Sequence, residues 1–395
     1  MERIISSLLD TDLYKLTMAQ VAFNQFPEAV VTYEFVNRGK TPFTYEFACR
    51  LQDQVDAMAD LRLTSEEYGF MRSIRFFKPT FCEWFYHYRF APSDISIEFL
   101  PWYEGVHNHP QNLGDIRISI RGPWFKRIFW EVPLMALMSE LHFQLKVKDP
   151  EWEARITSKA DRLEAAGVSW IDFGTRRRAS FEVQDRVVGK MKKYDHFRGT
   201  SNVLLAMRHG VKSQGTVAHE MYQAMQAKYG VLMSNQMASE HWVREYGGDL
   251  GVMLPDTLTT DVFMRGLSLR DAKLFDGARQ DSGDLVANAQ KYIDRLVELG
   301  VDPKAKVLVP SDALTVDKAI DFASRFEGKV KGVTAGIGTH LTNDCGFESL
   351  NMVIKMTGAD FGQGMVHVVK LSDTPGKHTG DKQRIAWVKQ ELGLA

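Results

Sequence analysis

The sequence predicts an α/β fold in which an α+β domain is followed by a (β/α) barrel, and three observations lead to this prediction. The chain has 395 residues, which suits about two domains, one of them a barrel. Strand-like and helical patterns alternate through residues 150–340, as they do in proteins with a parallel sheet. Four of the strand-like runs in that region are followed at once by a small polar cluster, which is typical of the active face of a barrel.

Residues 1–140 are expected to form the α+β domain. They contain strand-like runs at 30–36 (VVTYEFV) and 116–122 (IRISIRG), mixed with helical stretches. The apolar segment 123–143 has the length of a buried helix. Pro133 within it predicts either a kink or the start of a helix, because proline has no backbone N–H to donate.

Residues 141–345 are expected to form the barrel domain. Short apolar runs bounded by turn residues predict strands at 168–174, 306–312 and 329–338. Apolar stripes with helical spacing lie between the strands, and this alternation predicts βαβ units with a parallel sheet. A doubly wound open sheet is the alternative, because periodicity does not distinguish an open sheet from a closed one.

The polar clusters mark one end of this predicted sheet. They are TRRR after WIDFG, QDSGD after LFDGAR, SD after VLVP, and TH after GVTAGIG. In (β/α) barrels the loops that follow the strands carry the chemistry, so we expect these clusters to meet at one site. Residues 346–395 contain two more strand-like runs and a helical stretch, and they are expected to return to the N-terminal domain.

Composition argues against several classes of function. A formal net charge of -1 is not that of a generic nucleic-acid binder. The sequence contains no run of 18 apolar residues, so it predicts no membrane-spanning helix. Cys49, Cys82 and Cys345 lie far apart and form no CxxC pair, which argues against a zinc ribbon or a disulfide framework. Asp10 and Asp12 interrupt the first segment, so we expect no signal peptide and a cytoplasmic protein.

Two segments are rich in groups that bind anions. FGTRRR places Arg176, Arg177 and Arg178 after a buried strand and a glycine, where guanidinium groups can clamp a carboxylate or a phosphate. A solvated charged turn is the plain alternative, and the sequence does not say which arginine would touch a ligand. GTSN places Ser201 just before an apolar helix. The first amides of such a helix favour anions, although an ordinary N-cap explains the residues equally well.

Three further segments carry groups that are common in active sites. RQDSGD holds Arg279 and Asp281, which can contact an anionic ring and hold Mg²⁺ through water, or can simply cap the next helix. The turn at 336–339 (GIGT) can cradle a phosphate with its amides. GTVAHE contains His219, one of eleven histidines, and its spacing alone does not single it out. HNHP at 107–110 looks like part of a metal site, but no partner spacing supports it.

In their order along the chain, these segments resemble the bacterial type of nicotinate phosphoribosyltransferase. The match begins at SLLDTDLYKLTM and runs through FGTRRR, GTSN, GTVAHE, RQDSGD, SDAL and GIGTHLTND to KLSDTPGK, which is nearly the whole chain. The resemblance implies a type II phosphoribosyltransferase fold: an irregular (β/α) barrel plus an α+β domain built from both chain ends. It also implies a homodimer with its sites near the subunit boundary.

The resemblance assigns roles to individual residues as well. His219 would be the histidine that ATP phosphorylates, and Asp281 would act beside the ribose. Tyr14, from the neighbouring subunit, and Phe173 would cover the two faces of the pyridine ring. The other expected substrate contacts are Arg176, Ser201, Thr216, Arg279, Asp312, Gly338 and Thr339.

The implied reaction makes nicotinate mononucleotide and pyrophosphate from nicotinate and phosphoribosyl pyrophosphate, as a salvage step toward NAD. ATP would be a co-substrate, and Mg²⁺ would be held through the substrate phosphates. Related nicotinamide-using enzymes carry an acidic residue where this chain has Ser201, which favours the acid as substrate. The rival interpretations are a nicotinamide or quinolinate phosphoribosyltransferase on the same fold, a barrel hydrolase or aldolase, and a sensor that binds ligand without turnover.

Overall fold

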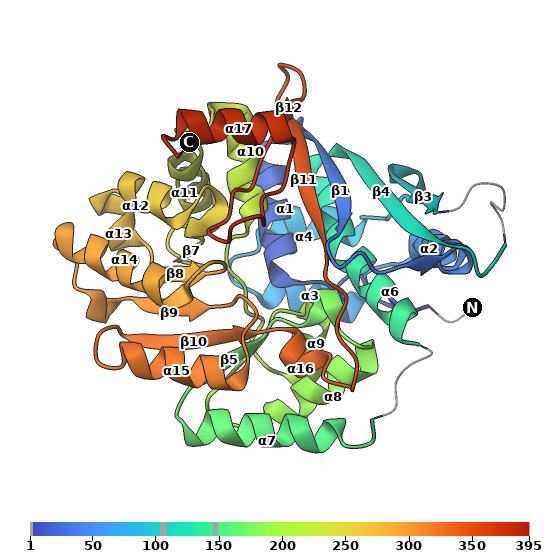
Figure 1. Cartoon of the computed structure of the whole chain (residues 1–395), viewed down its shortest axis with the longest axis horizontal. Helices are drawn as coiled ribbons and strands as arrows, with labels where there is room; N and C mark the ends of the chain where they lie inside the picture. Colours follow the sequence, from blue (N-terminus) through green and yellow to red (C-terminus); the bar gives the residue numbers. More distant parts are fainter. Residues whose placement is uncertain (1–2, 103–108, 145–148, 395) are drawn as a thin grey trace.

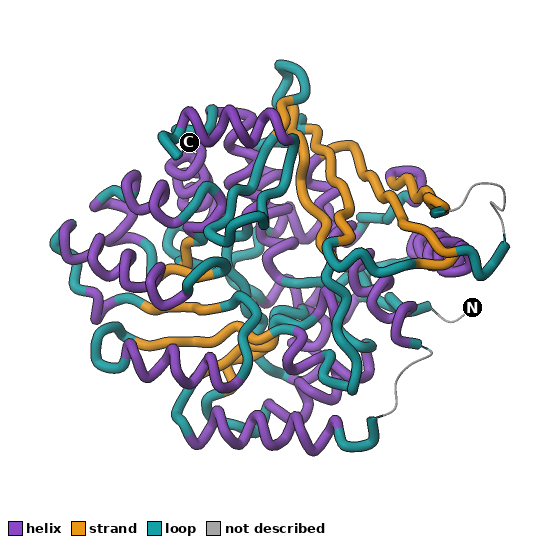
Figure 2. Tube along the Cα trace, viewed as in Figure 1, coloured by secondary structure: helices purple, strands orange, loops and turns teal. Residues whose placement is uncertain are grey.

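Two sheets and the helices around them make up the molecule (Figure 1). The structure is a computed structural model, and it describes residues 3–102, 109–144 and 149–394. Figure 2 shows the two groups of strands in different parts of the molecule, each with helices beside it. One sheet is antiparallel and the other parallel, so the predicted α/β class is confirmed.

The antiparallel sheet has the strand order β12-β11-β1-β4-β2, with β3 also paired to β4. Its strands are β1 (Val30–Asn37), β2 (Phe43–Thr44), β3 (Ile95–Pro101), β4 (Leu113–Pro123), β11 (Met352–Asp360) and β12 (Val366–His367). The central pair joins the two ends of the chain, because β1 pairs with β11 from Val30↔Asp360 to Asn37↔Met352. The predicted return of the C-terminal segment is therefore confirmed.

Alternation along the strands gives this sheet one apolar and one polar face. Ile116, Ile118 and Ile120 of β4 are buried. They lie on one side of the sheet because residues two apart in a strand point the same way, and helices cover that side. The opposite face, with Thr32 and Lys355 among its residues, lines an open groove of about 1310 Å³.

The helices of the N-terminal part pack against the apolar face and against one another. They are α1 (Leu13–Gln25), α2 (Tyr45–Ala57), α3 (Ser65–Ser73), α4 (Pro79–Tyr86), α5 (Trp124–Arg127) and α6 (Glu131–Phe143). Pro133 lies in the first turn of α6, where a missing N–H costs no helical hydrogen bond. The predicted helix start is thus correct, and no single helix covers 123–143.

The parallel sheet has the order β6-β5-β10-β9-β8-β7. Its strands are β5 (Ser169–Asp172), β6 (Phe197–Thr200), β7 (Val252–Met253), β8 (Gly277–Gln280), β9 (Val307–Pro310) and β10 (Gly332–Ile337). Beyond β6 the pairing continues only as an isolated bridge from Thr200 to Ser213. Among the described strands, β6 and β7 stand at the two edges of this sheet, and no strand pairing joins them.

At least one helix lies between each of these strands and the next along the chain, as predicted. The helices are α7 (Trp152–Ala165), α8 (Phe181–Met191), α9 (Val203–His209), α10 (His219–Tyr229), α11 (Ser234–Tyr246), α12 (Thr260–Gly266), α13 (Leu269–Leu274), α14 (Leu285–Glu298), α15 (Val316–Phe326), α16 (Thr339–Thr342) and α17 (Lys382–Glu391). Of these, α7 precedes the strands and α17 follows β12. Across the described residues, none of the helices is both long and apolar enough to cross a membrane.

A buried arginine joins the N-terminal part to the parallel sheet. Both terminal nitrogens of Arg178 donate to Asp10, each at 2.7 Å, and its Nε donates to Glu140 at 2.7 Å. Asn202, before α9, donates to the same Asp10 at 2.7 Å. Arg178 is fully buried, so it is a structural residue and not a ligand contact.

Removing one partner of this arginine should destabilise the protein strongly. Asp10→Ala leaves the Arg178 charge buried with one carboxylate fewer, and we expect it to lower the free energy of unfolding by about 3–5 kcal/mol. The matched control is Asp60→Ala, because Asp60 pairs with Arg3 at 2.6 Å at the surface and such pairs contribute little. Urea unfolding followed by tryptophan fluorescence measures both variants. Equal losses in the two would contradict the role given to Arg178.

Candidate functional site

A cavity of about 350 Å³ lies where the parallel strands end at their carboxyl termini. It brings residues of the N-terminal part together with residues of the parallel sheet, because α1 and the loops after β5, β6, β8, β9 and β10 all reach it. The predicted site residues among its lining are Tyr14, Phe173, Arg176, Ser201, Thr216, Arg279, Asp281, Gly338 and Thr339. The remaining two, His219 and Asp312, line the cavity next to it.

Two aromatic rings line the cavity. The Phe173 N–H donates to the Ile337 carbonyl at 2.8 Å, and its ring occupies the space over Gly336. A Cβ at position 336 would stand 2.4 Å from that ring, so only glycine leaves room for it. Tyr14 lies in the first turn of α1.

Tyr14 reaches the cavity of its own chain. The N–H of the preceding residue, Leu13, donates to the Ser201 carbonyl at 2.8 Å, and Asp12 and Asn202 form a β-bridge. These contacts fix the start of α1 against the loop after β6. The chain's own Tyr14 therefore lines the cavity, and the expectation that the neighbouring subunit supplies a tyrosine stays a prediction.

Arg279, at the end of β8, is the best-placed cation for a small anion. One terminal nitrogen donates to Thr216 Oγ1 at 2.8 Å, and the other lies 3.3 Å from an Asp281 oxygen. Its Nε–H is buried and has no partner within the described residues. The exposed part of the Arg279 side chain lines the cavity, so a ligand carboxylate there would meet its guanidinium group.

A carboxyl group also lies in the cavity, at Asp12. Ser201 Oγ donates to Asp12 Oδ1 at 2.7 Å, and Arg176 Nε lies 3.8 Å from the other oxygen. Burial raises the pKa of Asp12. Position 201 itself carries no carboxylate, as the sequence shows, but the carboxylate of Asp12 lies beside its hydroxyl, so the residue at position 201 does not by itself decide between an acid and an amide as ligand.

The adjoining cavity, of about 170 Å³, surrounds His219. It shares Tyr14, Arg176, Arg279 and Asp281 with the first cavity. A ligand group in one cavity is therefore within reach of side chains that line the other.

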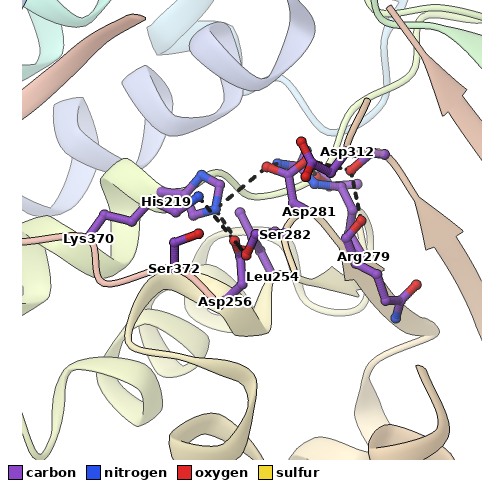
Figure 3. A network of polar contacts seen from close by, with 12 residues as sticks. His219, Leu254, Asp256, Arg279, Asp281, Ser282, Asp312, Lys370 and Ser372 are labelled. Atoms are coloured by element: carbon purple, nitrogen blue, oxygen red, sulfur yellow. Dashed lines mark hydrogen bonds and ion pairs between the residues drawn. The ribbon is translucent and has the colours of Figure 1, made fainter. Parts of the chain in front are cut away.

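His219, the first residue of α10, is held by a hydrogen bond to a carboxylate. Its Nε2 lies 2.7 Å from Asp256 Oδ1 and 3.7 Å from Asp281 Oδ2 (Figure 3). The second Asp256 oxygen accepts from Ser282 Oγ at 2.6 Å and from Lys370 Nζ at 3.0 Å. Asp256 is therefore fixed from both sides.

The electrostatics of this pair keep the histidine neutral. Burial lowers the pKa of His219 to about 4, although the Asp256 charge opposes that shift. Burial alone would raise the pKa of Asp256, but His219 and Lys370 outweigh it and hold that pKa well below its usual range. At neutral pH the contact is thus a hydrogen bond from Nε2–H to a carboxylate, which leaves the lone pair on Nδ1.

Sequence reasoning missed Asp256. It follows β7, a strand of only two residues, so no strand-like run announced it. The segment LPDTL is nevertheless a polar turn after an apolar run, as in the four clusters that were recognised. The role of Lys370 was likewise not foreseen, although KLSDTPGK was part of the family match.

His219, Asp256 and Asp281 lie close enough to share a metal ion, but their hydrogen bonds fit another use. Nε2 of His219 is a donor, and both Asp256 oxygens already accept. Both oxygens of Asp281 accept as well, from Ser311 at 2.6 Å and from Arg279 at 3.3 Å. Asp312, which has a contact to Lys377 at one oxygen, is the less engaged carboxylate and fits Mg²⁺, which prefers one or two carboxylates together with water and phosphate oxygens. His107 of the HNHP segment lies outside the described residues.

A cationic surface leads away from His219. Arg177 lines both cavities and the open groove, and within the described residues its guanidinium forms no hydrogen bond or ion pair. Burial, together with Arg176 and Arg38, lowers the pKa of Arg177 to about 10. Burial likewise lowers the pKa of Lys355 to about 8. Lys377 lies 3.3 Å from Asp312.

This distribution of charge fits a polyanion. A phosphate chain stabilises clustered cations, and Arg38, Arg177, Lys355 and Lys377 line both the His219 cavity and the groove. Of the three adjacent arginines, Arg177 is therefore the one that is free to bind a ligand. The sequence had left that choice open.

Comparison with known proteins gives concordant matches along the chain. A model of the nicotinate phosphoribosyltransferase (NAPRTase) family matches residues 168–395, and a model of the N-terminal domain of that family matches residues 9–139. A nicotinate phosphoribosyltransferase of Chromohalobacter salexigens is 40% identical over 99% of each chain. One from Methanosarcina acetivorans is 36% identical, over 97% of this chain and 96% of its own.

Solved structures agree with these relatives. The nicotinate phosphoribosyltransferase of Porphyromonas gingivalis has a TM-score of 0.92 at 37% identity, over 99% of this chain and 100% of its own. A putative nicotinate phosphoribosyltransferase of Saccharomyces cerevisiae has a TM-score of 0.92 at 32% identity over 100% of both chains. Sequence and structure together establish that the chain belongs to the nicotinate phosphoribosyltransferase family.

Proposed function

We propose that this chain joins nicotinate to phosphoribosyl pyrophosphate and couples the reaction to ATP hydrolysis through a phosphohistidine at His219. The observation that carries the proposal is the position of this histidine. It is buried and neutral, it hydrogen-bonds through Nε2, and it lies between an aromatic cavity with a free arginine donor and a cationic groove. The product, nicotinate mononucleotide, is a precursor of NAD.

Nicotinate fits the first cavity by shape and charge. Its ring would lie against Tyr14 and Phe173, and its carboxylate would accept from the guanidinium group of Arg279, which lines the cavity. Charge-assisted bonds of this kind are among the strongest that a protein offers a carboxylate. The amides around Gly338 and Thr339 would hold the 5-phosphate of the ribose.

Glycosyl transfer then needs little covalent chemistry from the protein. The pyridine nitrogen bonds to the anomeric carbon while the bond to pyrophosphate breaks, and the electron pair leaves with pyrophosphate. Burial opposes the ionisation of Asp281, but Arg279 and His219 outweigh it and lower its pKa to about 2. Its negative charge can therefore stabilise the positive charge that develops on the ribose. Bound Mg²⁺ would neutralise charge on the departing pyrophosphate, beside Asp281 and Asp312.

Phosphorylation of His219 uses the lone pair on Nδ1. This nitrogen attacks the γ-phosphorus of ATP, the N–P bond forms, and the bond to ADP breaks. The Nε2 proton stays between the ring and Asp256, whose carboxylate stabilises the positive charge that the ring gains. Water later cleaves the N–P bond and releases phosphate, which resets the histidine. Coupling requires that the phosphorylated enzyme bind substrates differently from the free enzyme.

The assembly state and location remain proposals that rest on the family resemblance. We propose a homodimer in the cytoplasm, with the partner subunit near the mouth of the cavity.

The first prediction concerns substrate and coupling. Pyrophosphate release should occur with nicotinate and not with nicotinamide, and MgATP should stimulate it. His219→Ala should lose the stimulation and keep slow, ATP-independent transfer, because His219 touches only the ATP half of the reaction. Turnover with the amide alone, or a stimulated His219→Ala variant, would rule out the proposed function, and binding without any turnover would indicate a sensor.

The second prediction concerns the atom that is phosphorylated. Phosphorus NMR of enzyme treated with MgATP should show an acid-labile phosphohistidine on Nδ1, because Asp256 occupies Nε2. Asp256→Asn keeps the shape but removes the charge that stabilises the ring, and it should slow phosphoenzyme formation. Since the pKa of His219 is about 4, protonation of the ring should not lower this rate until the pH falls toward that value. Label on Nε2, or on another histidine, would exclude this mechanism.

The third prediction separates the two anion sites. Arg279→Met should raise KM for nicotinate by about 10- to 100-fold, as expected for the loss of a charged hydrogen bond, with a smaller effect on phosphoribosyl pyrophosphate. Arg177→Met should do the reverse, because Arg177 also lines the cationic groove, which Arg279 does not. Each variant is the control for the other. If both raise the same KM, the division of the cavity is wrong.

A further inference from the structure

A buried ionic cluster lies beneath the two cavities and connects them. Its centre is Lys15, which is fully buried in α1. Lys15 Nζ lies 2.5 Å from Glu220 Oε2 and 2.5 Å from Glu131 Oε2. Burial would lower the pKa of this lysine, but Glu131 and Glu220 outweigh it and raise that pKa, so the ammonium stays charged.

One end of the cluster is attached to the histidine. Glu220 follows His219 directly in the first turn of α10. Its other carboxylate oxygen accepts from Tyr33 OH at 2.5 Å and from Trp124 Nε1 at 2.7 Å. Glu220 therefore has a defined geometry, and any shift of α10 at His219 changes its distance to Lys15.

The other end of the cluster is attached to the nicotinate side. Glu131, at the start of α6, lies 3.4 Å from Arg176 Nη1. The Arg176 guanidinium lies 5.8 Å from the centre of the Tyr14 ring, and both residues line the first cavity. Lys15 itself is not among the lining residues of either cavity. It can act on substrates only through these neighbours.

We propose that Lys15 is a positioning residue that couples the phosphorylation state of His219 to the binding of nicotinate. The inference rests on the proposed function, because it needs a phosphohistidine. The physical reason is that one ammonium group holds two carboxylates, one beside the histidine and the other beside Arg176. Phosphate adds roughly two negative charges next to Glu220. Lys15 must then shift between Glu220 and Glu131, and this shift changes the ion pair between Glu131 and Arg176.

The test measures the coupling itself. For each enzyme, kcat/KM for nicotinate is determined with and without MgATP, and the ratio of the two values is the ATP stimulation. Couplings between sites are typically about 5- to 150-fold. Lys15→Met, which keeps the length of the side chain, should reduce the ratio to about 1 and leave ATP-independent turnover largely intact. Lys15→Arg, which keeps the charge, should retain part of the stimulation.

The control is another buried lysine. Lys306 donates to the carbonyls of Lys273 and Phe275 and lies away from the cluster, so Lys306→Met should keep the full ratio. Circular dichroism and the melting temperature report whether each variant is folded. If Lys15→Met does not fold, Glu131→Gln decides instead. It keeps an acceptor for Lys15 but loses the charge that holds Arg176, and it should lower the ratio.

Three outcomes separate this inference from the proposed function. If ATP does not stimulate the unaltered enzyme, the proposed coupling is ruled out, and the inference is ruled out with it. Stimulation in the unaltered enzyme that persists in Lys15→Met, or in Glu131→Gln where that variant decides, would overturn the inference alone. An equal fall in stimulated and unstimulated turnover would show a merely structural lysine and would also overturn it. The inference is supported if Lys15→Met loses the ATP stimulation but keeps its unstimulated turnover, and if Lys306→Met keeps the full stimulation.

Discussion

The burial of His219 is the constraint on which the site depends. An imidazole in water has a pKa near 6.5 and is partly protonated at neutral pH, and the protonated ring has no lone pair for attack. Burial lowers that pKa to about 4, and Asp256 then fixes the tautomer by accepting from Nε2 at 2.7 Å. Burying Asp256 would itself be unfavourable without partners, and Ser282 and Lys370 offset this.

The topology of the chain supplies these partners from distant segments. Asp256 follows β7 in the parallel sheet, whereas Lys370 belongs to the segment after β12, which the pairing of β1 with β11 brings back. Without that return, Asp256 would lose a cation and the groove would lose Lys377. The C-terminal segment is therefore part of the chemistry of the site and not only an edge of a sheet. The buried contacts of Arg178 with Asp10 and Glu140 keep both halves in register.

Much of this arrangement could be predicted from the sequence, because it follows from local patterns. Strands that end in polar clusters imply a common edge, and the residues of those clusters do meet in the cavities. Adjacent residues were harder to separate. Arg177 and Arg178 look alike in TRRR, yet one lines the cavities and the other is fully buried against carboxylates. Only the tertiary contacts decide that Arg178 is the buried arginine, because its partners, Asp10 and Glu140, lie far from it in the chain.

Long-range contacts also explain what the sequence patterns did not reveal about Asp256 and Tyr14. The sequence shows no clear strand pattern before Asp256, because β7 has only two residues. The position of Tyr14 depends on a backbone hydrogen bond from Leu13 to Ser201. No periodicity within either segment encodes such a bond. Residues whose roles come from one distant partner are therefore the ones that sequence patterns identify least well.

The same geometry bears on how an acid is distinguished from its amide. The absence of a carboxylate at Ser201 is not sufficient, because Asp12 places one 2.7 Å from its hydroxyl. That charge is already engaged, by the hydroxyl and by Arg176 at 3.8 Å, so its repulsion of a bound anion is reduced. Arg279 offers the donors of its guanidinium group at the cavity. A carboxylate accepts at both oxygens, whereas an amide can accept at only one and turns its own N–H groups toward other donors. Discrimination would then come from the cost of leaving the Arg279 donor unsatisfied, which is the kind of penalty that gives polar sites their selectivity.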